Sequence, residues 1–461
     1  MEAGMAHKSP RRTAKVLATL AVVSLGLAAC GSSSDDGDSG SGDSAATKID
    51  CAPYEKFGDL KGKEVSVYTT IVAPEDGPHI ASYKPFEDCT GVKIKYEGSR
   101  EMEAQISVRV KGGNAPDIAY LPQPGLLKTL VATGKVIPAP PETEANVDAN
   151  MPDWKTYGTV DGKFYAAPLG ANVKSFVWYS PTAFKDKGYE IPKTWDELLA
   201  LTDKIATDNP EAKPWCAGIE SGDATGWPAT DWVEDVMLRT AGAETYDKWV
   251  NHEIPFNDPA VATALAEVGK ILKNPKYVNG GYGDVKTIAS TSFQDAGQPI
   301  LDGTCFMHRQ ASFYAANWPE GTNVAEDGDI WAFYLPAKDE TTKPVLGAGE
   351  VTAAFRDAPE VKAFQTYLAS TEWAVERAKT CGTGGCLTAN VNVDPTLLKN
   401  PIDNLSATML TDKNATFRFD GSDLMPGAVG AGTFWKGMVN WITGENDKAT
   451  LDYIENSWPK S

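Results

Sequence analysis

The chain has 461 residues and a formal net charge of −19. Such an acidic chain is not expected to bind nucleic acid, because the phosphate backbone attracts basic surfaces. Its length exceeds what one hydrophobic core usually supports, so we expect two domains. One apolar run near the start is too short to span a bilayer, and no later run approaches that length.

The N-terminal segment has the pattern of a secretory signal. Four basic side chains precede an apolar stretch at residues 16–29, so residues 1–29 are predicted to be removed. The sequence "LAAC" that ends at Cys30 resembles the bacterial lipobox, which implies a lipid on Cys30 and a protein held at the extracytoplasmic face of the membrane. Residues 30–50 are mostly small and polar and predict a flexible tether. An ordinary signal peptide, with Cys30 incidental, is the alternative.

Six cysteines follow Cys30, an even number that favours disulfides in an exported chain. Six cysteines permit 15 pairings, and the sequence alone does not choose among them. We expect the pairs Cys51–Cys89, Cys216–Cys305 and Cys381–Cys386. The last pair closes "CGTGGC", whose glycines let the chain turn back on itself. A metal site is the rival interpretation, but no second cysteine pair or histidine cluster supports it.

In chain order, strand-like and helix-like stretches alternate, which predicts an α/β fold with largely parallel sheets. The expected strands are "EVSVYTT", "VKIKYEG", "PDIAYLP", "GKFYAAPLG" and "KSFVWYS". A helix is expected at residues 79–91, and a second between Thr194 and Pro210, where Thr194 and Glu197 form a capping box. Apolar stripes predict two more helices, "TDWVEDVMLRTAG" ending at Gly242 and "TFWKGMVNWITG" ending at Gly444.

The ordered set of segments resembles a known family. "FYAAPLGANVKSFVWYS", "GWPATDWVEDVMLR", "ILDGTCFMHR" and "GTFWKGMVNWITG" are similar to the extracellular solute-binding proteins of bacterial ABC sugar importers, and most similar to the α-glucoside-binding group. The resemblance runs from about Val65 to about Trp458. It implies a bilobal fold like that of the periplasmic binding proteins, with two α/β lobes, three crossings between them and the ligand in a central cleft.

That pattern also implies how the chain divides. Lobe 1 would comprise residues 51–166 and 341–389, and lobe 2 residues 167–340 and 390–461. The first crossing would lie near "PLGAN" and the second near "PVLGAGE". Small residues suit segments that change backbone angles during closure, and here they are Gly170, Gly347 and Gly349. Ordinary turns are the alternative role for these glycines.

A sugar site needs aromatic rings for the faces of the sugar and polar groups for its hydroxyls. In lobe 1 the candidates at strand ends are Tyr68, Thr70, Arg100, Glu101, Tyr120 and Gln123. In lobe 2 and past the crossings they are Asn172, Lys174, Asp223, Trp227, Asp231, His308, Arg309, Glu350 and Trp435. Arg100 and Glu101 could instead form a solvated helix start, and Asp231 a helix cap.

The resemblance gives Trp435 and Asn172 a specific role, and the chemistry of an arginine at a strand end gives one to Arg309. Trp435 matches the aromatic residue that stacks on the sugar in relatives. Asn172 stands where the maltose-binding relatives have an acid. Arg309 would hold hydroxyls, and would equally hold the acidic group of a sulfonated or carboxylated sugar.

The sequence therefore predicts a lipid-anchored receptor that captures an oligosaccharide, such as a maltose- or trehalose-type α-glucoside. We expect a monomer that delivers the sugar to ABC permease subunits, with no cofactor, no metal and no catalysis. A surface glycoside hydrolase, which would use two carboxylates, and a surface adhesin are the alternatives. No G-x-S-x-G motif or phosphate-binding loop points to other chemistry.

Overall fold

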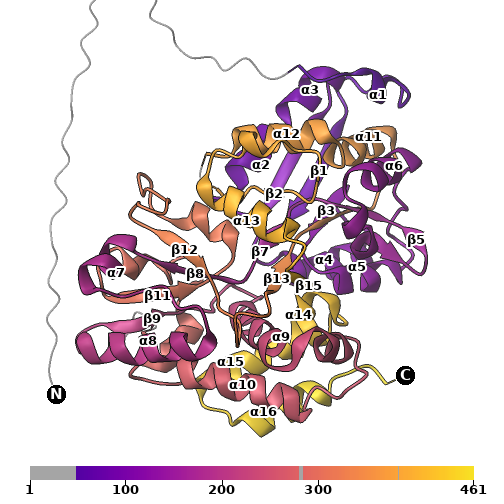
Figure 1. Ribbon diagram of the computed structural model, residues 1–461. Helices are drawn as coiled ribbons and strands as arrows, with labels where there is room; N and C mark the ends of the chain where they lie inside the picture. Colours follow the sequence, from indigo (N-terminus) through magenta and orange to yellow (C-terminus); the bar gives the residue numbers. More distant parts are fainter. Residues whose placement is uncertain (1–47, 280–283, 383, 461) are drawn as a thin grey trace, which may run out of the picture. The chain divides into compact units, whose positions relative to one another are not determined.

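The computed structural model describes residues 48–279, 284–382 and 384–460 (Figure 1). The predicted signal peptide, Cys30 and nearly all of the tether lie outside these residues. None of the helices in the described ranges combines the length and the apolar character that a membrane crossing needs.

The first five-stranded sheet has the order β2-β1-β3-β14-β6. Its strands are β1 (Glu64–Thr69), β2 (Lys93–Gly98), β3 (Ile118–Leu121), β6 (Ala166–Pro168) and β14 (Val351–Ala354). β1 pairs in parallel with β2 and β3, whereas β14 runs antiparallel to both of its neighbours. β14 comes from a segment about 230 residues after β3, so the sheet is built from two distant parts of the chain.

Helices from the same two parts of the chain pack around this sheet. They are α1 (Ala52–Glu55), α2 (Asp76–Ser82), α3 (Lys84–Thr90), α4 (Met102–Gly112), α5 (Pro124–Val131), α6 (Pro141–Asn150), α11 (Pro359–Leu368) and α12 (Thr371–Thr380). Figure 1 shows α11 and α12 beside α2 and α3, and α12 contacts α2. The helix expected at residues 79–91 is in fact α2 and α3, because Pro85 begins a new helix there.

The second five-stranded sheet has the order β10-β9-β11-β8-β12. Its strands are β8 (Phe176–Tyr179), β9 (Lys213–Cys216), β10 (Val278–Asn279), β11 (Cys305–Arg309) and β12 (Trp331–Tyr334). β9 pairs in parallel with β10 and β11, and β8 runs antiparallel to β11 and β12. Both sheets are therefore mixed rather than purely parallel.

The helices around the second sheet share one large hydrophobic core. They are α7 (Pro181–Lys187), α8 (Trp195–Asp208), α9 (Trp227–Val250), α10 (Pro259–Leu272), α13 (Pro401–Thr411), α14 (Gly421–Leu424), α15 (Trp435–Thr443) and α16 (Asp447–Glu455). Thr194 caps α8 as predicted. The helix expected to end at Gly242 continues as α9 to Val250, with a break at Gly242, where φ is +79°.

Shorter elements complete the described chain. A small sheet contains β7 (Asn172–Val173), β13 (Pro344–Ala348) and β15 (Thr416–Phe419), and a hairpin contains β4 (Thr159–Val160) and β5 (Lys163–Phe164). The 3-10 turns are Pro152–Gly158, Val285–Ser290, Gln298–Ile300, Ser312–Asn317 and Pro395–Leu397, and a π-helical turn spans Val429–Phe434. The structure contains the three predicted disulfides, Cys51–Cys89, Cys216–Cys305 and Cys381–Cys386.

Two segments connect the first sheet to the small sheet. The chain passes from β6 to β7 through Gly170 and from β13 to β14 through Gly349. A Cβ at Gly349 would lie 2.1 Å from the carbonyl oxygen of Gly170, so these segments approach closely only because residue 349 has no side chain. The predicted lobe boundaries near these segments stay a prediction.

Gly349→Ala is expected to lower the free energy of unfolding by about 1–3 kcal/mol, because the new methyl group would push the two crossings apart. Urea unfolding measures this. Gly77→Ala is the matched control, since nothing lies within 4 Å of a Cβ at Gly77 in α2, and alanine there should leave stability unchanged or raise it by up to about 1 kcal/mol. Equal effects of the two substitutions would contradict the packing role of Gly349.

Candidate functional site

A cavity of about 170 Å³ lies beside the two crossings. This volume is roughly ten times the space that one water molecule needs, so the cavity admits a larger polar solute. Its polar and aromatic lining includes Thr70, Glu75, His79, Arg100, Glu103, Gln123, Asn172, Lys174, Trp227, Asp231, Glu350, Trp373, Arg377, Asp420, Asp423 and Trp435. Residues that follow β1 and β3 thus share the cavity with residues at the starts of α9 and α15.

Two of the three tryptophans in the described lining, Trp227 and Trp435, stand at the starts of helices. Trp227 begins α9, and its ring centroid lies 5.0 Å from that of Phe293 and 6.1 Å from that of Phe313. Trp435 begins α15, directly after the π-helical turn. A Cβ at Gly226 would lie 2.3 Å from the carbonyl oxygen of Trp435. Gly226 also has a φ of +118°, which suits glycine alone, so this glycine brings both tryptophans to one cavity.

Five buried polar atoms of the lining residues have no partner among the described residues. They are His79 Nδ1, Gln123 Oε1, Asn172 Oδ1, Arg377 Nη1 and Trp435 Nε1. A buried donor or acceptor without a partner costs about 1–3 kcal/mol, so such atoms usually bind water or a ligand. Donors and acceptors lie around the same cavity, as a solute with several hydroxyl groups requires.

Two lining carboxyl groups are close to their protonation midpoint at neutral pH. Burial raises the pKa of Glu75 to about 7, although Asn317 Nδ2 donates a hydrogen bond to Glu75 at 3.2 Å. Burial also raises the pKa of Glu103 to about 7. These groups can therefore donate or accept a hydrogen bond, depending on the solute.

A buried cation lies between two other lining carboxylates. Lys174 Nζ is 2.9 Å from Asp231 Oδ1 and 2.5 Å from Asp420 Oδ2. All three side chains are almost fully buried. The oxygens of Asp231, Glu234 and Asp420 are close enough together to hold a metal ion, but the ammonium of Lys174 already supplies the positive charge there.

Residues 70–375 match the family described as bacterial extracellular solute-binding protein. The chain belongs to this family. This agrees with the resemblance found in the sequence, and it makes the chain a solute-binding protein of an ABC importer that acts outside the cytoplasm.

The solute-binding protein is 43% identical over 424 residues to the alpha-glucosides-binding periplasmic protein AglE of Rhizobium meliloti, which covers 88% of this chain and 89% of AglE. It is 40% identical over 412 residues to the osmoprotective compounds-binding protein GgtB of Synechocystis sp., which covers 87% of this chain and 94% of GgtB. Its structure is similar to that of the bacterial solute receptor AcbH, with a TM-score of 0.70, 19% identity and coverage of 86% and 98%. The likeness confirms the predicted bilobal α/β fold.

Most of the predicted site residues line the cavity of this solute-binding protein. They are Thr70, Arg100, Gln123, Asn172, Lys174, Trp227, Asp231, Glu350 and Trp435. The solute contacts of these residues stay a prediction.

Four other predicted site residues do not line the cavity. They are Tyr68, Glu101, Tyr120 and Asp223. Tyr68 lies in the core with the guanidinium of Arg109 3.8 Å from its ring centroid. Tyr120 donates or accepts a hydrogen bond with Tyr83 in another part of the core. Glu101 and Asp223 are exposed and lie next to each other outside the lining. Tyr68 and Tyr120 were each predicted from a strand end, but their side chains point into the cores that cover the sheet.

His308 and Arg309 also lie behind the cavity rather than in its lining. His308 Nδ1 donates to the carbonyl oxygen of Cys216 at 3.0 Å, and burial lowers its pKa to about 4, so it is neutral. Arg309 is paired with Asp231 and Asp235. Arg309 therefore does not line the cavity, and a direct contact between Arg309 and the solute stays a prediction that this placement does not support.

Several lining residues were not predicted. Glu75 directly precedes α2, and His79 lies within it. Arg377 and Trp373 lie on α12, and Asp420 precedes α14. No local pattern marks these positions, because each reaches the cavity only through the pairing of distant segments.

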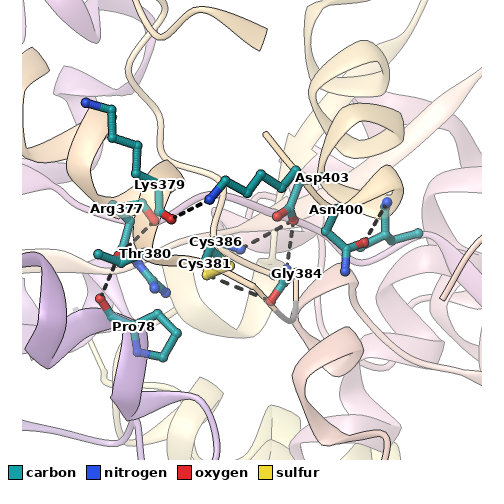
Figure 2. Close-up of a disulfide and its surroundings, with 12 residues drawn as sticks. Pro78, Arg377, Lys379, Thr380, Cys381, Gly384, Cys386, Asn400 and Asp403 are labelled. Carbon is teal, nitrogen blue, oxygen red and sulfur yellow. Dashed lines mark hydrogen bonds between the residues drawn. A yellow bond between two sulfur atoms is a disulfide. The ribbon is translucent and has the colours of Figure 1, made fainter. Parts of the chain in front are cut away.

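The loop after α12 contributes Gly384, Gly385 and Cys386 to the lining of the cavity. Figure 2 shows the Cys381–Cys386 disulfide, which joins the two ends of this loop. Asp403 Oδ1 accepts hydrogen bonds from the backbone N–H of Gly385 at 2.7 Å and of Cys386 at 3.3 Å. The disulfide and Asp403 together hold this loop in one position.

Replacing both Cys381 and Cys386 with serine is expected to weaken solute binding about three- to tenfold, because the freed loop must be ordered again on binding. Calorimetric titration measures the dissociation constant. Cys51→Ser with Cys89→Ser is the matched control. That disulfide lies outside the lining, so its loss should lower stability and leave affinity unchanged. An unchanged affinity in the first variant would show that the disulfide does not shape the site.

Proposed function

We propose that this solute-binding protein captures an α-linked glucoside, such as a maltose- or trehalose-type disaccharide, and delivers it to an ABC permease. The observation that carries the proposal is the cavity, in which Trp227 and Trp435 lie together with five unpartnered buried polar atoms. The 43% identity to a protein named for binding alpha-glucosides supports the choice of sugar.

The cavity offers each part of a sugar a suitable partner. The indole rings of Trp227 and Trp435 provide flat surfaces for the C–H faces of the sugar rings. Asn172 Oδ1 and Gln123 Oε1 accept hydrogen bonds from hydroxyl groups, while Arg377 Nη1 donates one. A solute that satisfies these atoms removes the cost of leaving them unpaired.

Binding by residues of both lobes explains delivery. Gln123 follows a strand of the first sheet, and Trp435 begins a helix that packs with the second. A solute that contacts both stabilises the arrangement in which they are close, and the permease recognises that arrangement. The closed arrangement would then indicate to the permease that a solute is bound.

An acidic or sulfonated sugar is a weaker candidate. Its support was Arg309, which is paired with Asp231 and Asp235. Carboxyl groups of Glu75, Glu103 and Glu350 also line the cavity. Their charge opposes that of an acidic solute, even though Arg100 and Arg377 are present.

A glycoside hydrolase is the second candidate, and one observation favours it. Glu75 and Glu103 each have a pKa of about 7, as a general acid requires. Both relatives above, however, are named for what they bind. We therefore propose that the sugar is released intact.

Trp435→Ala is expected to weaken binding of maltose or trehalose at least tenfold, because the sugar loses an apolar surface worth more than about 1.4 kcal/mol. Calorimetric titration with maltose, trehalose and a glucuronide measures this. Trp458→Ala is the matched control, since Trp458 stacks on His252 outside the lining and should leave affinity unchanged.

The same samples test the alternatives. Tight binding of the glucuronide alone would favour an acidic sugar, and release of glucose from the disaccharides would identify a hydrolase. Wild-type protein that binds none of the three would contradict the proposed function.

We also propose that a lipid on Cys30 holds the receptor at the membrane. Cys30→Ser is expected to move the protein from the membrane fraction to the medium, because the acyl chains provide the attachment. Cell fractionation measures the distribution. A serine variant that stays with the membrane would contradict the lipid anchor and leave the sugar site unaffected.

A further inference from the structure

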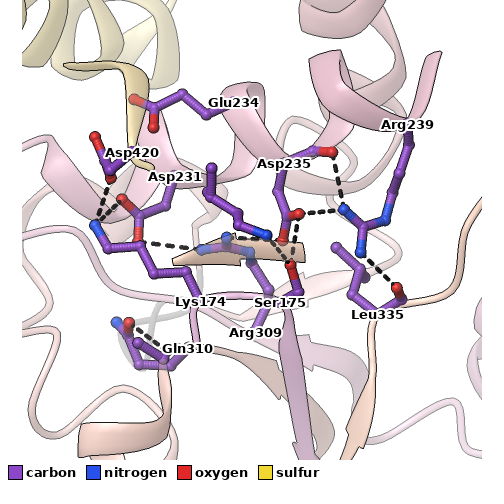
Figure 3. A network of polar contacts seen from close by, with 12 residues as sticks. Lys174, Ser175, Asp231, Glu234, Asp235, Arg239, Arg309, Gln310, Leu335 and Asp420 are labelled. Carbon is purple, nitrogen blue, oxygen red and sulfur yellow. Dashed lines mark hydrogen bonds and ion pairs between the residues drawn. The ribbon is translucent and has the colours of Figure 1, made fainter. Parts of the chain in front are cut away.

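A buried network of charges continues behind the cavity (Figure 3). Lys174, Asp231 and Asp420 line the cavity, whereas Arg309 and Asp235 do not. Arg309 Nη1 donates to Asp231 Oδ2 at 3.3 Å, and its Nη2 donates to Asp235 Oδ2 at 3.0 Å. Arg309 therefore joins the carboxylate that faces the solute to a second carboxylate behind it.

The rear of the network is fixed by the backbone. Ser175 Oγ donates to Asp235 Oδ1 at 2.8 Å, and Arg239 also contacts this oxygen. Arg239 donates to the carbonyl oxygens of Leu335 at 2.6 Å and Pro336 at 3.0 Å. Asp235 thus has a fixed position from which it orients Arg309.

The network pairs its cations with carboxylates. Burial and the charge of Asp420 raise the pKa of the neighbouring Glu234 well above its ordinary value. The cations are Lys174, Arg239 and Arg309, and the carboxylates that they contact are Asp231, Asp235 and Asp420. Each cation contacts at least one carboxylate, as buried charges require.

We propose that Arg309 is a positioning residue for solute binding, which holds Asp231 ionised and oriented to accept a hydrogen bond from a solute hydroxyl without touching the solute. Lys174 donates to Asp231 Oδ1 and Arg309 to Asp231 Oδ2, so each carboxylate oxygen has one cationic neighbour. A charged acceptor makes stronger hydrogen bonds than a neutral one. The proposal rests on the proposed function and deepens it, since it concerns the same cavity.

The electrostatics of Asp231 agree with this role. Burial and the charge of Asp420 raise the pKa of Asp231, whereas Lys174 and Arg309 lower it. The resulting pKa of Asp231 is about 6. The other ionisable groups that face this cluster are Glu234 and Asp235 on α9 and Asp423 on α14. Loss of the Arg309 charge raises the pKa of Asp231 further, so Asp231 binds a proton at a higher pH.

The test measures affinity against pH. The dissociation constant of maltose and trehalose is measured by calorimetry between pH 5 and 8 for wild type, R309M, R309K and R418K. In wild type, affinity is expected to fall as pH decreases through about 6. R309M is expected to bind about tenfold more weakly at pH 7. The pH at which its affinity decreases is expected to be about one unit higher than in wild type. R309K keeps the charge and should lie between the two.

R418K is the matched control, because Arg418 pairs with Asp247 and lies outside both the cavity lining and the network. Its pH profile is expected to match that of wild type. R309M with wild-type affinity and pH profile would overturn the proposal. An equal loss of affinity at every pH would also overturn the proposal, because a purely structural defect does not shift the pH at which Asp231 titrates. If R309M does not fold, R309Q replaces it, since glutamine keeps an amide NH2 donor without the charge.

A ligand-free arm separates this proposal from the proposed function. If wild type binds neither sugar, the proposed function fails, and the titration of the Asp231 side-chain carboxyl is then followed by 13C NMR in ligand-free wild type and R309Q. D231N assigns the resonance. A midpoint that rises in R309Q supports the positioning role, and an unchanged midpoint overturns it.

Discussion

The rest of the site depends on the ion pairs that the buried ammonium of Lys174 forms. Removing a charge from water costs several kcal/mol, and only close partners offset that cost. The partners here are Asp231 near the start of α9 and Asp420 before α14. Because these three residues are far apart in the sequence, the charge requirement brings three segments together. The start of α9 is thereby held where Trp227 reaches the cavity, with Lys174 Nζ 5.4 Å from its ring centroid.

A second constraint comes from the segments between the sheets. Leu169 N donates to the carbonyl oxygen of Glu350 at 2.8 Å, and Ala171 N donates to that of Leu387 at 3.0 Å. Three segments therefore run side by side along the cavity, and each contributes lining residues. Their backbone groups are occupied by one another, so the polar side chains around them are left to meet a solute. For this reason, the part of the cavity wall that offers polar side chains to the solute consists of connecting segments rather than of regular strands.

The sequence predicted the order of the elements and the fold class well, because the strand patterns, the Thr194 cap and the family resemblance are local or collinear signals. It predicted side-chain direction poorly. Tyr68 lies within β1 and packs into the core that covers the sheet, whereas Thr70, two residues later, follows the end of β1 and lines the cavity, so the alternation along the strand does not predict its direction. Arg309 was predicted as a contact since its partners Asp231 and Asp235 lie over 70 residues away. Arg377 was missed for the same reason, because its helix α12 reaches the cavity by packing against α2, which comes from a distant part of the chain.

The carboxyl groups of the cavity show how one site can serve a solute that both donates and accepts hydrogen bonds. Burial alone raises the pKa of a carboxyl group, as it does for Glu103. Burial also raises that of Asp420, but the ammonium of Lys174 more than compensates and lowers the pKa to about 2. Asp420 is thus a fixed acceptor, whereas Glu103 exchanges its proton near neutral pH. A sugar hydroxyl needs partners of both kinds, and Asp420 and Glu103 supply one of each to the same cavity.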